Sequence, residues 1–153
     1  MFRGINAVNI DAKGRLSIPA KYRDRIKSEA LGRLVATIDT DEHCLLLYPL
    51  PAWEAIEGKL ARLPSFNAQA RRIQRLLMGH ATEADMDSQG RILLPPLLRE
   101  YAGLEKKVIL LGQGNKFEIW SESGWQSRRD HWLDEEKQSE KNDLPDDLQS
   151  LSL

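Results

Sequence analysis

The sequence predicts an α+β fold built from two copies of one unit, with a helical insert between them and a helix near the C-terminus. The main observation is an internal repeat: the stretch "DAKGRLSIPAKYR" at residues 11–23 returns as "DSQGRILLPPLLR" at residues 87–99. In the residues that precede each copy, apolar and polar side chains alternate, as in half-buried strands. Between the copies, apolar side chains follow helical spacing instead. Two similar units in one chain predict an internal pseudo-symmetry.

Each copy is expected to form a strand, a turn, a second strand, a short helix and a hairpin. When the two copies are aligned, Val8 and Ile10 of the first strand correspond to Ala84 and Met86 in the other copy. The turns, "DAKG" and "DSQG", have Asp at the first position and Gly at the fourth, which is typical of a type I turn. The hairpins are "RLVATIDTDEHCLLLYP" and "KKVILLGQGNKFEIW", each with a polar turn between two apolar strands.

The expected helices follow the turns and fill the insert. The short helix "PAKYRDRI" begins at Pro19, with Ser17 as a candidate cap, and Pro95-Pro96 begins its counterpart. The insert contains "PAWEAIEGKLARLP" and "SFNAQARRIQRLLMG", which ends at Gly79. Their predicted apolar faces are Trp53, Ile56, Leu60 and Leu63, and Phe66, Ala70, Ile73 and Leu77. A last helix is "SESGWQSRRDHWLDEEK", with Trp125 and Trp132.

These elements divide the chain into four expected segments. They are a first repeat at 5–52, a helical insert at 53–80, a second repeat at 81–124, and a C-terminal helix with an acidic tail at 125–153. The second helix of the insert also carries Arg71, Arg72 and Arg75 on its polar face. A solvated surface or ion pairs between subunits explain these three cations more readily than DNA contact does.

The charge is distributed unevenly along the chain. The formal net charge is −1, but residues 130–153 carry eight acidic and two basic side chains, which leaves a net charge of +5 on the rest. Residues 11–27 alone carry six basic and two acidic side chains. A basic body with an acidic tail is consistent with a polyanionic partner. A solvated surface with a solubilising tail is the alternative explanation.

The composition also limits the classes of function. No apolar run approaches the length of a membrane span, and the N-terminal residues do not form a secretory signal, so a cytoplasmic location is expected. The single cysteine, Cys44, is expected to be a buried thiol on a strand. The histidines His43, His80 and His131 are isolated, so no metal site is expected. The sequence contains no phosphate-binding glycine loop and no nucleophile motif, so we expect neither a cofactor nor an enzyme.

The repeated turn offers a way to hold an arginine in a fixed direction. Arg15 and Arg91 follow four residues after Asp11 and Asp87, close enough for each carboxylate to brace the guanidinium. A braced guanidinium is suited to a phosphate or to a guanine edge. The alternative is that the aspartates, the arginines and the glycines Gly14 and Gly90 only build the same turn twice.

The motif of a strand, "D-x-x-G-R", an apolar residue, proline and a later arginine resembles the SpoVT-AbrB type of bacterial DNA-binding domain. Two copies around a helical insert are similar to the MraZ family, as are "MFRG", "CLLLYPLPAWE", "RRIQRLLMGHATE" and "NKFEIW". This resemblance implies an AbrB-like swapped-hairpin β-barrel with both halves supplied by one chain. It further implies a ring-shaped homo-oligomer that binds direct repeats in the promoter of its own division and cell-wall gene cluster, chiefly as a repressor, in association with the nucleoid.

In that family DNA contact is attributed to the paired D-x-x-x-R motifs, here Asp11 with Arg15 and Asp87 with Arg91. We expect Arg15 and Arg91 to contact double-stranded DNA, with Lys13 and Gln89 beside them. The two aspartates, together with Gly14 and Gly90, are expected to shape and brace the turns. Three further cations, Lys21, Arg23 and Arg99, are candidates either for phosphate contact or for surface salt bridges.

The second motif is less cationic than the first, because Gln89 replaces Lys13 and "PLL" replaces "AKY". This difference suggests that the first copy contributes more phosphate affinity and the second more of the packing between subunits. Within the DNA-binding class, the alternative interpretation is an AbrB-like antitoxin or global regulator with loose sequence preference. Outside it, the alternative is a ring-forming scaffold or protein-interaction module without a specific DNA target. Neither a membrane nor a small-molecule substrate is expected as a partner.

Overall fold

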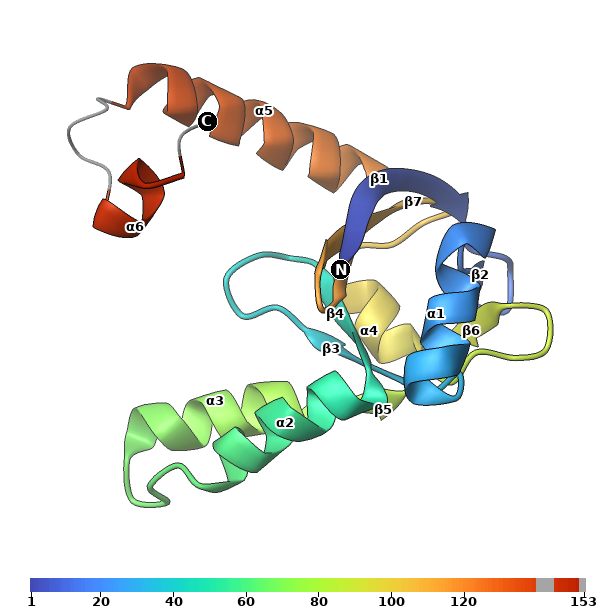
Figure 1. Cartoon of the computed structure of the whole chain (residues 1–153), viewed down its shortest axis with the longest axis horizontal. Coiled ribbons are helices and arrows are strands. Elements are labelled where there is room, and N and C mark those ends of the chain that lie inside the picture. The colour runs from blue at the N-terminus through green and yellow to red at the C-terminus, as the bar shows by residue number, and fades with distance from the viewer. Residues whose placement is uncertain (140–144, 152–153) are drawn as a thin grey trace.

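The computed structural model describes residues 1–139 and 145–151. Within these ranges the chain is α+β, with eight strands in two antiparallel sheets and six helices (Figure 1). The elements of the first repeat are β1 (Phe2–Asn9), β2 (Arg15–Ser17), α1 (Ala20–Ala30), β3 (Leu34–Ile38) and β4 (Leu45–Pro49). Those of the second are β5 (Thr82–Glu83), β6 (Arg91–Leu93), α4 (Pro96–Tyr101), β7 (Lys107–Gly114) and β8 (Phe117–Ser121). Between the repeats lie α2 (Leu50–Ala61) and α3 (Ala68–Gly79), and after them α5 (Glu122–Gln138) and α6 (Asp146–Gln149).

The two repeats exchange their first strands. The larger sheet has the order β1-β7-β8-β4-β3-β5, so β1 pairs with a strand of the second repeat and β5 with a strand of the first. Exchanging each strand for its counterpart in the other repeat reproduces this order from the opposite end. The two-stranded sheet again joins one strand from each repeat, β2 and β6. Each repeat therefore depends on the other for the strand pairing of β1, β2, β5 and β6, whereas β3–β4 and β7–β8 pair within one repeat.

The two exchanged strands differ in length, and the second ends before the Ala84 and Met86 positions that the sequence predicts as strand. β1 pairs with β7 over eight residues, whereas β5 has only two residues, and Ala84 and Met86 lie beyond it. The physical reason is Asp85, whose side chain accepts a hydrogen bond from the Leu34 amide at 3.2 Å. The amides of Ala84 and Met86 still donate to the first repeat, so the chain stays beside β3 without a regular ladder.

The main hydrophobic core contains side chains from both repeats and so packs the two repeats together. Leu16 and Ile18 of the first repeat are fully buried, and so are their counterparts Ile92 and Leu94 in the second. Both pairs belong to one continuous apolar cluster that also includes Phe117 and Ile119 of β8. The β2–β6 sheet is thereby fixed to the body of the protein through its apolar side.

The first helix begins differently from the prediction. Pro19 is the cap residue of α1, and no side chain caps this end, so the expected role of Ser17 is wrong. Ser17 instead belongs to β2, where it pairs with Arg91 of β6. Because Ser17 is paired in this sheet, its hydroxyl does not cap the end of α1. In the second repeat α4 begins at Pro96, with Pro95 as its cap residue.

The helical insert forms an antiparallel pair that projects from the sheet (Figure 1). Trp53 and Leu60 of α2 pack with Ile73 and Leu77 of α3 and with strand residues in a second core. The predicted apolar faces are too long, because Leu63 and Phe66 lie in the connection between the helices. Leu63 is 37% exposed and Phe66 is 92% exposed. Helix α3 begins instead at Ala68, after the cap residue Asn67, whose side chain accepts a hydrogen bond from the amide of Ala70.

The last long helix, α5, includes both predicted tryptophans. Trp125 and Trp132 pack edge-on against Trp120 of β8, with ring centroids 5.7 and 5.8 Å away. Arg128 binds Glu42 of the β3–β4 loop through two hydrogen bonds, at 2.7 and 3.0 Å. Part of the predicted acidic tail, at 140–144 and 152–153, lies outside the described residues.

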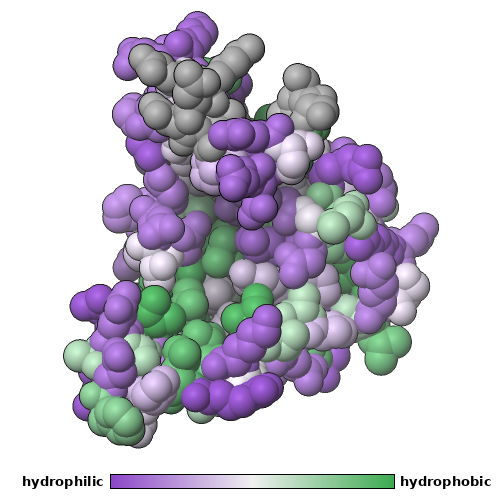
Figure 2. All heavy atoms as spheres, turned by 60° about the vertical axis from the view of Figure 1, so that its left-hand side comes forward, coloured by the Kyte–Doolittle hydropathy of each residue, from purple (hydrophilic) through white to green (hydrophobic). Residues whose placement is uncertain are grey.

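The side of the molecule that carries the insert and α5 is shown in Figure 2. Polar side chains cover most of this face, while apolar side chains gather in its lower central part. None of the helices in the described ranges has the length and apolar composition that a membrane span requires.

Candidate nucleic-acid interface

The first D-x-x-x-R motif forms a closed turn around one carboxylate. Asp11 Oδ1 accepts the backbone amides of Lys13 and Arg15, both at 2.9 Å, and Oδ2 accepts Arg15 Nε at 2.7 Å. The backbone closes the turn, because the Gly14 amide donates to the Asp11 carbonyl at 3.0 Å. Gly14 has a φ of +87°, which an L-residue with a side chain rarely adopts. Asp11 therefore both shapes the turn and holds Arg15.

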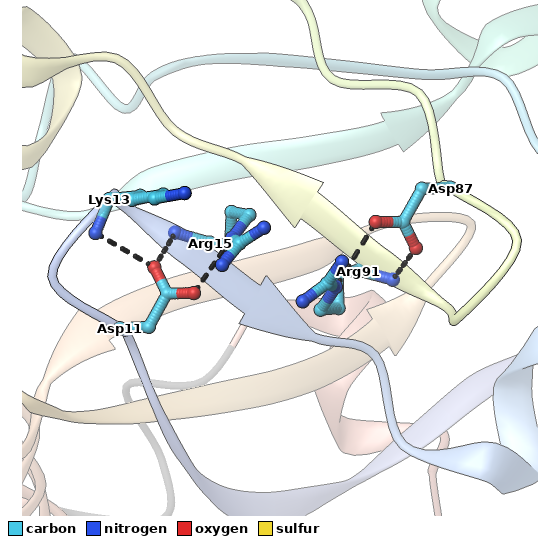
Figure 3. Close-up of polar contacts among 5 residues, drawn as sticks. All are labelled: Asp11, Lys13, Arg15, Asp87 and Arg91. Carbon is cyan, nitrogen blue, oxygen red and sulfur yellow. Dashed lines mark hydrogen bonds and ion pairs between the residues drawn. The ribbon is translucent and has the colours of Figure 1, made fainter.

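The second motif repeats this arrangement atom for atom. Asp87 Oδ1 accepts the amides of Gln89 and Arg91 at 2.9 Å, and Oδ2 accepts Arg91 Nε at 3.1 Å. Gly90 donates to the Asp87 carbonyl at 3.0 Å and has a φ of +77°. The chemistry of "D-x-x-G-R" thus produces the same geometry in two places of the chain. Figure 3 shows both arginines lying between the two aspartates.

Both aspartates are held in the charged form. The backbone amide of Arg15, followed by its guanidinium and the amide of Lys13, lowers the pKa of Asp11 despite partial desolvation. The amides of Arg91 and Gln89 lower the pKa of Asp87 in the same way. An ionised carboxylate holds each guanidinium through its Nε, and no ion pair within the described part of the chain engages the outer nitrogens.

The side chains of Arg15 and Arg91 lie on the same face of the β2–β6 sheet. In its register Arg15 faces Leu93, Leu16 faces Ile92, and Ser17 faces Arg91. Because neighbouring side chains of a strand alternate in direction and the central pair is buried, the flanking residues point outward. The outer face therefore consists of Arg15, Ser17, Arg91 and Leu93. A two-stranded ribbon of this kind has the width that the major groove of DNA admits.

Two residues of this face are not among the predicted contacts. Ser17 is exposed, and Leu93 is 55% exposed although it belongs to a strand. The spacing of two residues from Arg15 and from Arg91 could have indicated them. That spacing is informative only once both segments are known to be strands of one ribbon.

The remaining predicted residues lie close to the ribbon. Lys13 and Gln89 are exposed at the tips of the two turns. Lys21 is exposed on α1, with its Nζ 5.0 Å from the centre of the Tyr22 ring. Arg23 and Arg99 donate through Nε to the carbonyls of Ile18 and Leu94, at 2.7 and 3.0 Å. Neither forms an ion pair with a residue in the described part of the chain.

One other cluster has the side-chain types of a metal site. One atom each of Asp39, Cys44 and Glu118 lies within 4.8 Å of the others. Cys44 is fully buried, as predicted, but it immediately precedes β4. Burial raises the pKa of its thiol and that of the Glu118 carboxyl, which favours their protonated forms. The thiol lies 3.7 Å from Asp39 Oδ2, and Glu118 accepts from Trp120 Nε1 at 3.0 Å. These contacts are those of a hydrogen-bonded group in the core.

The comparison with known proteins assigns the family. The family model of the MraZ protein matches the chain twice, over residues 1–76 and 77–144. The chain belongs to the MraZ family. Each match places the aspartate of a D-x-x-x-R motif at the same distance from its start, since Asp11 and Asp87 are both the eleventh residue. Each match contains one of the two D-x-x-x-R repeats of the sequence, and its bounds are wider than the predicted 5–52 and 81–124.

Relatives of this chain in the MraZ family are similar over their whole length. Proteins named transcriptional regulator MraZ from Coxiella burnetii, Halorhodospira halophila and Legionella pneumophila are 60%, 56% and 56% identical to it. Each comparison extends over 153 residues and covers the whole of both chains.

Proposed function

We propose that this chain is a sequence-specific, DNA-binding transcriptional regulator. The observation that carries the proposal is the outer face of the β2–β6 ribbon, where Arg15 and Arg91 are both braced by an aspartate. A guanidinium held in one direction loses little conformational freedom when it binds, which favours a bidentate contact with phosphate or guanine. The names of the MraZ relatives agree with this function.

The proposed architecture is a pseudo-symmetric, swapped-hairpin β-barrel of the AbrB type. Its support is the strand order of the larger sheet and the exchange of β1 and β5 between the repeats. We keep the four-part division of the chain at 5–52, 53–80, 81–124 and 125–153 as part of this proposal. In this arrangement both turns belong to one rigid ribbon, so they meet a duplex together.

We further propose that several chains assemble into a ring that binds direct repeats in the promoter of its own division and cell-wall gene cluster. Lys13, Arg15 and Arg91 supply only three cations per chain, which is few for tight binding at physiological salt. Adjacent subunits on adjacent repeats make later contacts intramolecular and raise avidity by about 10²–10⁴. Occupation of the promoter then acts chiefly as repression, and the protein associates with the nucleoid in the cytoplasm.

The test is fluorescence anisotropy on a labelled duplex taken from the DNA upstream of this protein's own gene. Wild type and the Arg15→Ala/Arg91→Ala variant are titrated over a salt series, with random duplex as the competitor. We expect tight, salt-sensitive binding that the double variant abolishes. Arg62→Ala/Arg129→Ala is the matched control, because it also removes two arginines, one directly after α2 on the projecting insert and one on α5.

Two outcomes would contradict the proposal. Equal affinity of the wild type for promoter and random duplex would favour the ring-forming scaffold without a specific DNA target. Equal affinity for duplexes with one and with several repeats would contradict the ring. Analytical ultracentrifugation of the free protein measures the assembly independently of DNA.

A further inference from the structure

The two turn glycines are buried against arginines of the opposite repeat. A Cβ atom built on Gly90 would lie 2.6 Å from Cζ of Arg23, which belongs to α1 of the first repeat. A Cβ built on Gly14 would lie 3.0 Å from Cζ of Arg99, which belongs to α4 of the second repeat. Each guanidinium thus lies in the space that the Cβ atom of any other residue type would occupy at the position of the glycine.

Backbone hydrogen bonds cross between the repeats at the same two places. The Ile18 amide donates to the Gly90 carbonyl at 2.8 Å, and the Leu94 amide donates to the Gly14 carbonyl at 2.9 Å. The carbonyl of Ile18 accepts Arg23 Nε, and that of Leu94 accepts Arg99 Nε. Arg23 therefore contacts both the residue that holds the second turn and the turn itself.

The sequence leaves two roles open for these arginines, phosphate contact or a surface salt bridge. A surface salt bridge has no support, since neither arginine has an ion pair among the described residues. Both side chains are half-buried, and their Nε groups are engaged by backbone carbonyls rather than directed outward. These contacts are those of groups that fix the protein backbone.

We propose that Arg23 and Arg99 are positioning residues that act across the repeats. Arg23 holds the second turn and so acts through Arg91, whereas Arg99 holds the first turn and acts through Arg15. This inference rests on the proposed function, because it assigns the braced arginines to DNA. It makes the two turns mutually dependent, since each is fixed by a helix that belongs to the other repeat.

The test is a set of crossed double-mutant cycles, measured by anisotropy on the promoter duplex. Arg23→Ala is combined with Arg91→Ala and, separately, with Arg15→Ala. We expect Arg23→Ala to weaken binding at least about fivefold on its own, the low end of a good guanidinium–base contact. Arg23→Ala should weaken binding little further when Arg91 is already absent, but it should weaken binding by its full factor when Arg15 is absent. Coupling of Arg23 to Arg15, or additivity in both cycles, would overturn the proposal.

The conservative variant Arg23→Lys separates positioning from phosphate contact. Lysine keeps the positive charge but lacks the planar group that binds the Ile18 carbonyl beside Gly90. We expect Arg23→Lys to bind DNA as weakly as Arg23→Ala and with the same salt dependence as Arg23→Ala. Recovery of affinity in the lysine variant would show a phosphate contact and overturn the inference.

Amide hydrogen exchange tests the same contacts without DNA. In Arg23→Lys, exchange should accelerate at Gln89, Gly90 and Arg91 and stay unchanged at the first turn. In Arg99→Lys the effect should appear at residues 13–15 instead. Equal acceleration at both turns, or none, would overturn the proposal whether or not the protein binds DNA. If the exchange pattern is crossed but the wild type does not prefer promoter DNA, the proposed function fails while the positioning contacts stand.

Discussion

Arg15 Nε lies 2.7 Å from Asp11 Oδ2, and the other oxygen of the same carboxylate accepts the amides of Lys13 and Arg15. One acidic side chain therefore determines both the shape of the turn and the direction of its cation. An acidic residue at a DNA-binding surface is unfavourable by charge alone. The fixed direction of Arg15 explains the presence of Asp11, provided that it raises the affinity for DNA more than repulsion between Asp11 and the phosphates lowers it.

This relationship predicts the sign of an unusual mutation. Asp11→Asn removes a negative charge near DNA, so charge alone predicts tighter binding. Because the amide cannot form the ion pair with Arg15, we expect weaker binding, by roughly threefold to tenfold. Anisotropy on the promoter duplex measures the change. Asp41→Asn makes the same change of charge in the β3–β4 loop and serves as the control. Tighter binding by Asp11→Asn would contradict the bracing role.

The two turns should contribute unequally to the electrostatic part of binding. Lys13 lies at the first tip where the second has Gln89, while the hydrogen bonds around the two aspartates are the same. Lys13→Ala should reduce the slope of log affinity against log salt by about 0.9 if Lys13 neutralises one phosphate, and Gln89→Ala should leave the slope unchanged. Arg15→Ala should weaken binding more than Arg91→Ala. The reverse order would refute this division between the repeats.

The local geometry of the site is predictable from the sequence, whereas the pairing of the repeats is not. Asp at the first position and Gly at the fourth determine the turn by contacts within five residues, and so the Asp11–Arg15 pair follows from spacing. Nothing local indicates that Arg23 lies against Gly90 of the other repeat. For the same reason local spacing wrongly predicts Ser17 as a helix cap, since its pairing with Arg91 depends on a strand far along the chain. The exposure of Phe66 likewise depends on where α3 begins.

The outer face of the ribbon predicts a role for Leu93 in sequence preference. It is 55% exposed and lies opposite Arg15, in the place that Ser17 has in the first repeat. An apolar side chain in the major groove can contact the methyl group of thymine. We expect Leu93→Ser to leave the melting temperature unchanged and to lower the preference for promoter over random duplex. Unchanged preference, measured by competition anisotropy, would remove Leu93 from the interface.

The thiol of Cys44 should be inert in the folded protein. It is fully buried, and burial raises its pKa far above the ordinary value, so almost no thiolate forms at neutral pH. Titration with a thiol-specific chromogenic reagent should therefore be slow in buffer and fast in urea. Rapid reaction in buffer would indicate that the chain near β4 opens readily.

The lowered pKa values of Asp11 and Asp87 predict how stability depends on pH. Both lie below the ordinary value of 3.8, so the folded chain binds the corresponding protons less readily than the unfolded chain. Their contribution to the free energy of unfolding is complete above the ordinary pKa and disappears as the pH falls through the lowered values. The double variant Asp11→Asn/Asp87→Asn should thus be less stable than wild type at pH 7, and the difference should shrink below about pH 4. Urea unfolding at several pH values measures the two curves. A difference that stays constant into strong acid would mean that the carboxylates do not stabilise the turns through their charge.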